Sequence, residues 1–500
     1  TLTSGGIWDH KWEMLGGILN WKTDGTLTGK AYSTSMSILS TTCGIYADCS
    51  KKINRVTPNN NPNTIYAFAS GMVVPNSIQE SNVVSGNHTN RINLESNHPY
   101  VIPVSFDADS ASFTYTFPET EAGTGWHAFT MPFEADSIFI DDMPVSLEDS
   151  LNHFWIYEFS AESNSNEVVF KHATQLRGGT PYIIAGDAKM AGRSIVFRAT
   201  NVPFYKTGTD KMLVTSPSYK FHGNTYAPKL KDCYILNEEG TAFEYTTKLT
   251  ALKSMAPYFT TSLSTEEMPD SIALPEVPVS PGRNITLDET SSEAFAYGIY
   301  DQLTLKRTFE AGWNTVCLPF AVDSVATFFG DGSKAYEVLG LVEGELDCCP
   351  VDSLAASQPY IIYIPEDITE DFLLSDINIY PDDVTGGNTS VYDVSLQGTY
   401  VPIAENNWIK REETDVIYVL NADGTIVAAE EETSINGFRA YFDLPAGTET
   451  IALHLYDSPD AITSPLRESA KVGAIYNLAG QRLNKLSKGI NIINGRKVLK

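Results

Sequence analysis

The sequence predicts an all-β protein made of tandem antiparallel β-sandwiches of the immunoglobulin-like type, followed by a small C-terminal β-hairpin segment. Short runs rich in β-branched and aromatic residues, such as FWIYEF, EVVF and SIVF, recur along the chain. In residues 112–117 (SFTYTF) every second residue is aromatic, which is the period of a strand with one buried face. Turn signals separate many such runs, a spacing typical of sandwiches.

Residues 1–95 are expected to form an N-terminal β-rich module. They begin TLTSGGIWDH, without an initiator Met or a signal-peptide pattern, so we expect a mature or excised piece of a longer protein. Further on, NNNPNTIYAF indicates a loop that opens into a strand. Trp8, Trp12 and Trp21 cluster near the start of the module. Exposed, they could stack on sugar rings as a glycan-binding platform; buried, they would form the core of a small module.

Residues 96–274 and 285–456 are expected to be two copies of one β-sandwich module. Five blocks recur in the same order: GWHAFTMPF and GWNTVCLPF, TPYIIA and QPYIIY, FHGNTYAP and LQGTYVP, YILNEEGT and YVLNADGT, APYF and RAYF. The period is far too long for a solenoid repeat, so it indicates a duplicated domain. Trp126 and Trp313 hold equivalent positions in the first block, and we expect both to anchor a core.

The turns and the connection between the copies also have clear signals. Gly240 and Gly424 end the LNEEG and LNADG stretches, where a hairpin needs a residue with positive φ. Residues 275–284 contain Pro275, Pro278 and Pro281, which favour an extended, semi-rigid spacer.

Charge divides the chain into an acidic body and a basic tail. The 62 acidic and 34 basic residues give a net charge of −28. Residues 461–500 alone carry eight bases and one acid, a net charge of +7, so the rest of the chain carries −35. Such a body repels nucleic acid and anionic headgroups, and no run of 18 apolar residues exists to span a bilayer. In the segment 457–500, Asn494-Gly495 between two apolar runs predicts a two-residue hairpin.

Six cysteines leave the disulfide state open. Cys43 and Cys49 could close a small loop, and Cys317 could reach Cys348 or Cys349. Their density is far below that of a disulfide-stapled scaffold, so free thiols are the alternative. Cys233 lies in an apolar run and is expected to be a buried free thiol.

Recognisable catalytic and metal-binding motifs are missing from the sequence. It contains no HExxH pair, no GxSxG turn and no phosphate-binding loop, so we assign no catalytic, cofactor or metal residue and expect a non-enzyme. The acidic stretches at Asp141-Asp142 and residues 366–383 could bind calcium through carboxylate oxygens, but the DxDxDG spacing is absent. A solvated acidic surface is the favoured interpretation.

Several of these motifs resemble those of secreted and cell-surface proteins of Bacteroidota. The tail IYNLAGQRL…KGINIINGRKVLK is similar to their C-terminal sorting-type segment, and GWNTVCLPF, QPYII, YVLNADGT and FRAYF are similar to motifs of their repeated surface modules. The resemblance covers about residues 59–500. It implies an extracellular or outer-membrane location, an interaction of residues 466–500 with the secretion or outer-membrane machinery, and other surface proteins or glycans as partners.

Asp-Ser followed by an apolar residue occurs six times, where average composition predicts roughly one. This triplet resembles the O-glycosylation signal of the same bacterial group, which implies six candidate serines: Ser110, Ser137, Ser150, Ser271, Ser324 and Ser353. Ordinary turn chemistry is the alternative, since Asp and Ser both favour turns.

Three functions are compatible with these features. We expect a non-catalytic surface protein that serves adhesion, display or structural spacing. A glycan-binding component of a polysaccharide-uptake system is the first alternative. A hydrolase with a site between modules is the second.

Overall fold

The computed structural model is almost entirely β, with one short α-helix, α1 (Val325–Phe329), in the part of the chain that it describes. The described residues are 18–22, 35–37, 44–48, 55–58, 60–79, 81–119, 125–165, 167–208, 212–342, 344–384, 387–391, 394–404, 415–430, 433–445, 449–456, 475–477, 482–483, 490–493 and 496–499. The predicted all-β class is therefore confirmed. The chain divides into two compact units, Thr1–Gly282 and Arg283–Lys500, with the boundary inside the proline-containing segment 275–284.

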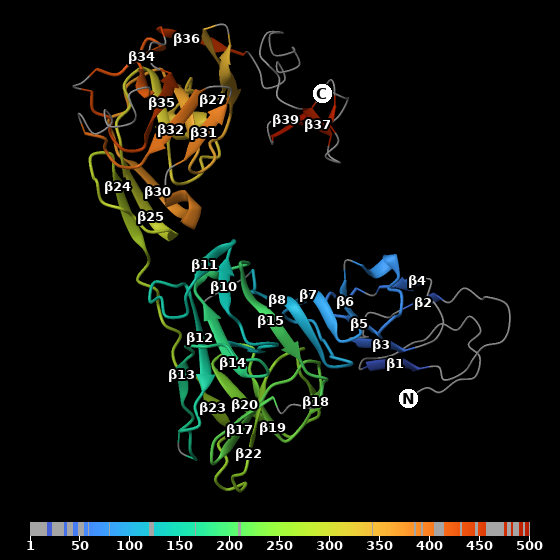
Figure 1. Cartoon of the computed structure of the whole chain (residues 1–500). Helices are drawn as coiled ribbons and strands as arrows, with labels where there is room; N and C mark the ends of the chain where they lie inside the picture. The colour runs from blue at the N-terminus through green and yellow to red at the C-terminus, as the bar shows by residue number, and fades with distance from the viewer. Residues whose placement is uncertain are drawn as a thin grey trace, which may run out of the picture. The chain divides into compact units, whose positions relative to one another are not determined.

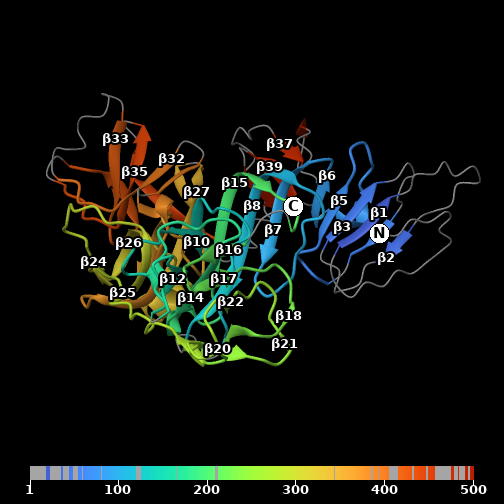
Figure 2. The same cartoon turned by 90° about the horizontal axis from the view of Figure 1, so that it is seen from below.

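The start of unit 1 is a solenoid-like array of parallel strands, called the parallel coil below. Its sheet contains β1 (Ile18–Lys22), β3 (Gly44–Asp48), β5 (Ile65–Phe68) and β6 (Asn82–Ser85), which lie side by side in Figures 1 and 2. The first residues of these four strands are paired in one row, and every pair is parallel. A second parallel pair joins β2 (Ser35–Ser37) to β4 (Arg55–Thr57). Such pairing is typical of a β-solenoid and not of an immunoglobulin-like sandwich, so the predicted antiparallel arrangement is wrong here.

The same sheet continues without interruption into the first repeated module. It is extended by β7 (His88–Glu95), β8 (Phe106–Thr116), β15 (Ser194–Phe204), β10 (Ser137–Ile140) and β11 (Met143–Val145). In β8 the predicted alternation is confirmed, because Phe113 and Tyr115 are buried and Thr116 is exposed.

Two further sheets complete the first module (Figure 1). The first has the order β13 (Phe170–His172), β12 (Phe154–Phe159), β14 (Pro181–Gly186), β9 (His127–Thr130). The second has the order β16 (Leu213–Thr215), β17 (Tyr219–His222), β22 (Tyr258–Thr261), β19 (Cys233–Leu236), β20 (Ala242–Thr246), β23 (Ser271–Ala273). A small pair joins β18 (Lys229–Leu230) to β21 (Thr250–Ala251).

The sheet that contains β14 lies between the other two sheets of the module. On one side, the Phe129 ring stacks against Phe113 and Phe197 of the long sheet at centroid distances of 5.9 and 6.0 Å. On the other side, Ile183 and Phe159 belong to one apolar cluster with residues of the third sheet. Every residue of β14 is buried, which explains the uninterrupted apolar run PYIIA. The module is therefore three layers of sheet, and the predicted two-layer immunoglobulin-like sandwich is wrong.

The second module repeats this strand order. The first group of strands has the order β24 (Asn284–Asp288), β25 (Gly298–Lys306), β30 (Phe372–Ile379). The second group has the order β26 (Gly312–Cys317), β29 (Pro359–Ile364), β27 (Lys334–Val342), β28 (Glu345–Val351). The third group has the order β36 (Ile451–Leu455), β34 (Thr425–Ala428), β33 (Asp415–Leu420), β35 (Arg439–Pro445), β32 (Val394–Thr399), β31 (Asn388–Val391). A parallel pairing of β28 with β36 fuses the second and third groups into one ten-stranded sheet.

Registers agree between the copies as well as strand order. Pro181 is paired with Thr130, and Pro359 with Cys317, at the same place in the repeated blocks. The parallel pair β7–β8 has its counterpart in β24–β25, so the repeated unit includes residues 88–95, which the sequence assigns to the N-terminal module. The copies differ after the first block, where one has the hairpin β10–β11 and the other has helix α1.

The two block tryptophans differ in burial. Trp126 is 1% exposed and its indole N–H donates to Pro275 O at 2.8 Å, so it is a core anchor as predicted. Trp313 packs against its core but is only partly buried, and the prediction holds for it in part. Gly240 and Gly424 have φ of 63° and 90°, as expected for the turn. A Cβ on Gly240 would lie 2.5 Å from the backbone nitrogen of Trp126. The contact between this turn and Trp126 therefore requires a glycine.

Four of the six cysteines lie in the part of the chain that the structure describes with side chains. Cys317, Cys348 and Cys349 are buried free thiols, which is the second of the two states that the sequence left open, and Cys317 and Cys348 belong to separate apolar clusters. Cys233 is a buried free thiol, as expected. Cys43 and Cys49 lie outside the described residues.

The C-terminal segment contains a four-stranded sheet. Its order is β38 (Arg482–Leu483), β37 (Ile475–Asn477), β39 (Ile490–Ile493), β40 (Arg496–Leu499). Ile493 is paired with Arg496 across the two-residue loop, so the predicted hairpin at 494–495 is confirmed.

Candidate functional site

The six Asp-Ser triplets lie on different elements of both units. Four of their serines are exposed: Ser110 on β8, Ser150 in a loop, Ser271 at the start of β23 and Ser353 after β28. Ser137 and Ser324 are half-buried. A modifying enzyme needs an accessible hydroxyl, so the structure separates the six candidates into four accessible and two less accessible ones.

In the second module, two triplets meet. The N–H of Val325 donates to Asp352 O at 2.9 Å, and Val322 and Leu354 form an isolated β-bridge. The hydroxyl of Ser324 accepts from Thr327 N at 3.3 Å and caps the N-terminus of α1. That hydroxyl already has a structural role.

In the first module, two triplets flank the same residue of β15. Asp136 accepts from the N–H of Thr200 at 2.8 Å, and Thr200 is paired on its other side with Ser110. The carboxylate of Asp149 accepts from Leu151 N at 3.0 Å. Local turn and strand-edge bonds thus account for the aspartates of two triplets.

The tryptophan platform cannot be located from the described part of the chain. Trp8 and Trp12 lie outside the described residues, and Trp21 belongs to β1, of which the backbone alone is described. The hypothesis of a glycan-stacking site at these three residues stays a prediction.

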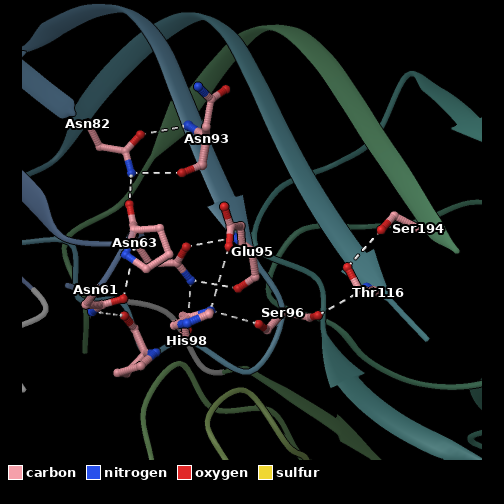
Figure 3. A network of polar contacts seen from close by, with 11 residues as sticks. Asn61, Asn63, Asn82, Asn93, Glu95, Ser96, His98, Thr116 and Ser194 are labelled. Carbon is pink, nitrogen blue, oxygen red and sulfur yellow. Dashed lines mark hydrogen bonds and ion pairs between the residues drawn. The ribbon is translucent and has the colours of Figure 1, made fainter. Parts of the chain in front are cut away.

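A network of buried asparagines joins the parallel coil to the first module (Figure 3). Asn63 is 0% exposed. Its amide accepts from Glu95 N at 2.7 Å and donates to Glu95 O and His98 O at 2.8 Å each. Asn82 makes equivalent bonds to Asn93, which lies two residues before Glu95 on β7. Its amide accepts from Asn93 N at 2.7 Å and donates to Asn93 O at 2.8 Å.

These asparagines act as substitutes for a neighbouring strand. The pairing of β6 with β7 is limited to Ser85 and His88, so the peptide groups of Asn93 and Glu95 face the coil without a strand beside them. A side-chain amide carries the same donor and acceptor as a peptide group, and buried peptide groups need such partners. The network therefore completes the edge of β7, and it attaches the loop that precedes β5 to this edge.

Sequence reasoning located the loop before β5 but did not assign this role to it. The signal was the Asn61-Pro62-Asn63 motif itself, in which Asn61 Oδ1 accepts from Asn63 N at 3.1 Å and Asn61 Nδ2 donates to Pro99 O at 2.8 Å.

A buried charged cluster distinguishes the second module from the first. Arg307 is 2% exposed, donates to Phe438 O and Thr315 O, and has its guanidinium 4.0 Å from the Phe309 ring centroid. Nearby, Glu289 Oε2 pairs with Arg439 Nη2 at 2.8 Å. Matched through the strand registers, the first module has Tyr115, Ser96 and Ala256 in place of these three charged residues.

Glu289 is held ionised by this environment. Burial raises its pKa, but the hydrogen bond from Thr308 N (3.1 Å) and the charge of Arg439 outweigh burial, so the pKa of Glu289 lies below its ordinary value. Two guanidinium groups and one carboxylate share the site, which is a structural ion-pair network at the junction of β25 and β35.

The acidic stretches have partners or solvent around them. Asp141 pairs with Arg193, and Asp142 Oδ1 pairs with Arg198 Nη2 at 2.9 Å. Both aspartates have positive φ in the two-residue turn between β10 and β11. Among the described residues, no group of three or more His, Cys, Asp or Glu side chains is placed to hold a metal ion. None of the described helices is long and apolar enough to cross a membrane.

The structure thus places four exposed candidate serines on a framework of β-sheets. Comparison with protein-family models, with curated proteins and with solved structures finds no match to the chain.

Proposed function

We propose that this chain is a non-catalytic secreted or cell-surface protein, in which tandem β-modules serve as an adhesive or spacing element. The observation that carries this proposal is the duplication: two modules with the same strand order and the same registers, each with its own apolar cores, lie on either side of a proline-containing connection. Repeating one stable module lengthens a protein while each copy keeps its own core, which suits a component that holds a binding surface away from its anchor.

We assign the address function to the tail. Residues 461–500 are basic while the body is strongly acidic, and the described strands among them, β37 to β40, form a separate small sheet. The resemblance of this tail to a sorting-type segment makes residues 466–500 the contact with the secretion or outer-membrane machinery of a Bacteroidota cell.

Surface labelling of the producing cells tests this proposal. We expect antibodies against unit 1 to label intact cells, and deletion of residues 466–500 to remove the label while the thermal unfolding of the body is unchanged. Equal labelling after deletion would separate the tail from surface localisation, and a protein found only inside the cells would end the proposal.

O-glycosylation of the Asp-Ser triplets is part of the same proposal. Exposure favours Ser110, Ser150, Ser271 and Ser353 as acceptors, whereas Ser324 caps α1. Peptide mass spectrometry of protein from the native host should find sugar at the four exposed serines and an unmodified Ser324. An intact mass equal to that of the bare chain contradicts glycosylation altogether.

A further inference from the structure

A small pocket lies at one end of the paired strands β8 and β15, in the long sheet of unit 1. It has a volume of about 180 Å³ and is formed at the start of β8 and the end of β15. Phe204 is paired with Phe106, and Pro203 with Asp107. The two phenylalanine rings are stacked at 5.0 Å and buried, so they line the pocket from the core side.

An aromatic residue and polar groups line the opposite, solvent side. Tyr205, the residue after β15, is 57% exposed. The polar lining residues are Asn87, Ser105 and Asp107, all exposed. Asn87 is held beside Asp107 by the bond from Asp107 N to Asn87 O at 2.9 Å, and Ser105 Oγ accepts from Lys206 N at 2.9 Å.

The acceptors and donors at this rim are available to a ligand. Within the described part of the chain, no side-chain hydrogen bond or ion pair occupies the Asp107 carboxylate or the Asn87 amide, whereas the nearby Asp109 lies 3.5 Å from His88. A carboxylate and an amide next to an exposed aromatic ring can together bind a molecule that has one apolar face and hydroxyl groups at its edge.

We propose that this pocket binds a single neutral pyranose ring of a glycan. The C–H face of the sugar lies against Tyr205 and Pro203, while adjacent hydroxyls donate to Asp107 and bond with Asn87. The pocket is smaller than the roughly 300–1,000 Å³ of sites for drug-sized ligands, which fits one ring. The Asp107 carboxylate and the net charge of −35 outside the basic tail disfavour an acidic sugar, because like charges repel.

The second module provides an internal comparison. In register, it has Ile299 in place of Asp107, Tyr297 in place of Ser105 and Asn378 in place of Pro203. Since Ile299 supplies no carboxylate, the second module lacks the combination of a carboxylate and a tyrosine at this position, and we assign the sugar site to the first module. The sugar site supplies a class of ligand for the proposed adhesive role. It depends on that role only for its biological setting.

Titration of the full chain by ligand-observed NMR tests the site. The probes are methyl glucoside, methyl galactoside and methyl mannoside, with glucuronic acid and glucosamine as charged counterparts. We expect saturable binding of at least one neutral glycoside, with a dissociation constant on the order of 1 mM, and at least tenfold weaker binding of glucuronic acid.

Three variants at the pocket and two controls locate the binding. Tyr205→Ala and Asp107→Asn should each weaken it at least tenfold, whereas Tyr205→Phe should retain it because the ring face remains. The matched controls, Tyr226→Ala (an exposed tyrosine elsewhere in unit 1) and Asp109→Asn, should leave it unchanged. Tyr205 and Asp107 are exposed, so their substitution should leave the unfolding temperature unchanged.

Three results would overturn the site: no saturable binding of the neutral glycosides, equal binding by Tyr205→Ala, or a preference for glucosamine that depends on its charge. Because this titration is done in solution, a failure here leaves the surface-labelling experiment intact, and a failure of surface labelling leaves the sugar site intact.

Discussion

The equivalent tryptophans of the two modules are in different environments. The indole of Trp126 is fully buried, bonded to Pro275 O and close to Tyr157 at a centroid distance of 4.8 Å, whereas Trp313 is partly exposed beside Tyr363. We therefore expect the same block to contribute different amounts of stabilisation in the two copies.

Truncation of these tryptophans should reveal that difference. We expect Trp126→Ala to destabilise unit 1 by about 3–5 kcal/mol, the usual cost of removing a buried aromatic side chain, and Trp313→Ala to destabilise unit 2 by less. Denaturant-dependent hydrogen exchange of the full chain, followed by peptides of each unit, measures both. Equal losses would show that burial does not set the cost.

Glu289 makes the stability of unit 2 depend on pH. Its folded pKa is lowered, so its contribution is present above the unfolded pKa of about 4.3 and is lost as the pH falls through the folded value. We expect acidification below about pH 4.3 to destabilise unit 2.

Glu289→Gln should cost about 3–5 kcal/mol at neutral pH, because it leaves the partly buried Arg439 and the buried Arg307 without their carboxylate. It should also flatten the pH dependence in the acid range. Glu293→Gln is the control in the same loop, since Glu293 is exposed. An unchanged acid transition in Glu289→Gln would assign the pH dependence to other carboxyls.

Single elements of the fold depend on side chains that complete them. The edge of β7 is completed by Asn63 and Asn82 instead of by a strand. The segment after Asp136-Ser137 forms the β10–β11 hairpin, whereas the equivalent segment after Asp323-Ser324 forms α1, because Ser324 caps the helix and Gly330 with φ of 96° ends it.

Removal of the Asn63 amide should loosen the junction between the coil and the module. Asn63→Ala leaves the peptide groups of Glu95 without partners on that side, at a cost of about 1–3 kcal/mol. Amide exchange in residues 65–68 and 93–96 should become faster, while β14 keeps its protection. Asn60→Ala, at an exposed position, should have no effect; unchanged exchange in Asn63→Ala would show that the bonds are not needed.

The whole molecule consists of two units that each have their own cores. Val279 in the connection is 87% exposed, so an inserted protease site after this residue should be accessible. We expect cleavage there to leave both unfolding transitions within about 0.5 kcal/mol of their values in the intact chain. A shift of both transitions after cleavage would mean that the units unfold as one cooperative body.

The sequence by itself determined the β class, the duplication, the positive-φ turns at Gly240 and Gly424 and the hairpin at 494–495. Alternation, block repetition and glycine placement are local signals, and they can be read without knowing which strands become neighbours. The Asp-Ser triplets were also visible locally, but their exposure was not.

Only the tertiary structure decided how the strands pair and layer. A run such as PYIIA is compatible with one buried face or two, and contacts from both neighbouring sheets decide that β14 is a middle layer. Parallel pairing of β1, β3, β5 and β6 depends on segments far apart in the chain. The pocket at Tyr205 likewise needs Asp107 and Pro203 side by side, and long-range pairing is the information that a local pattern does not contain.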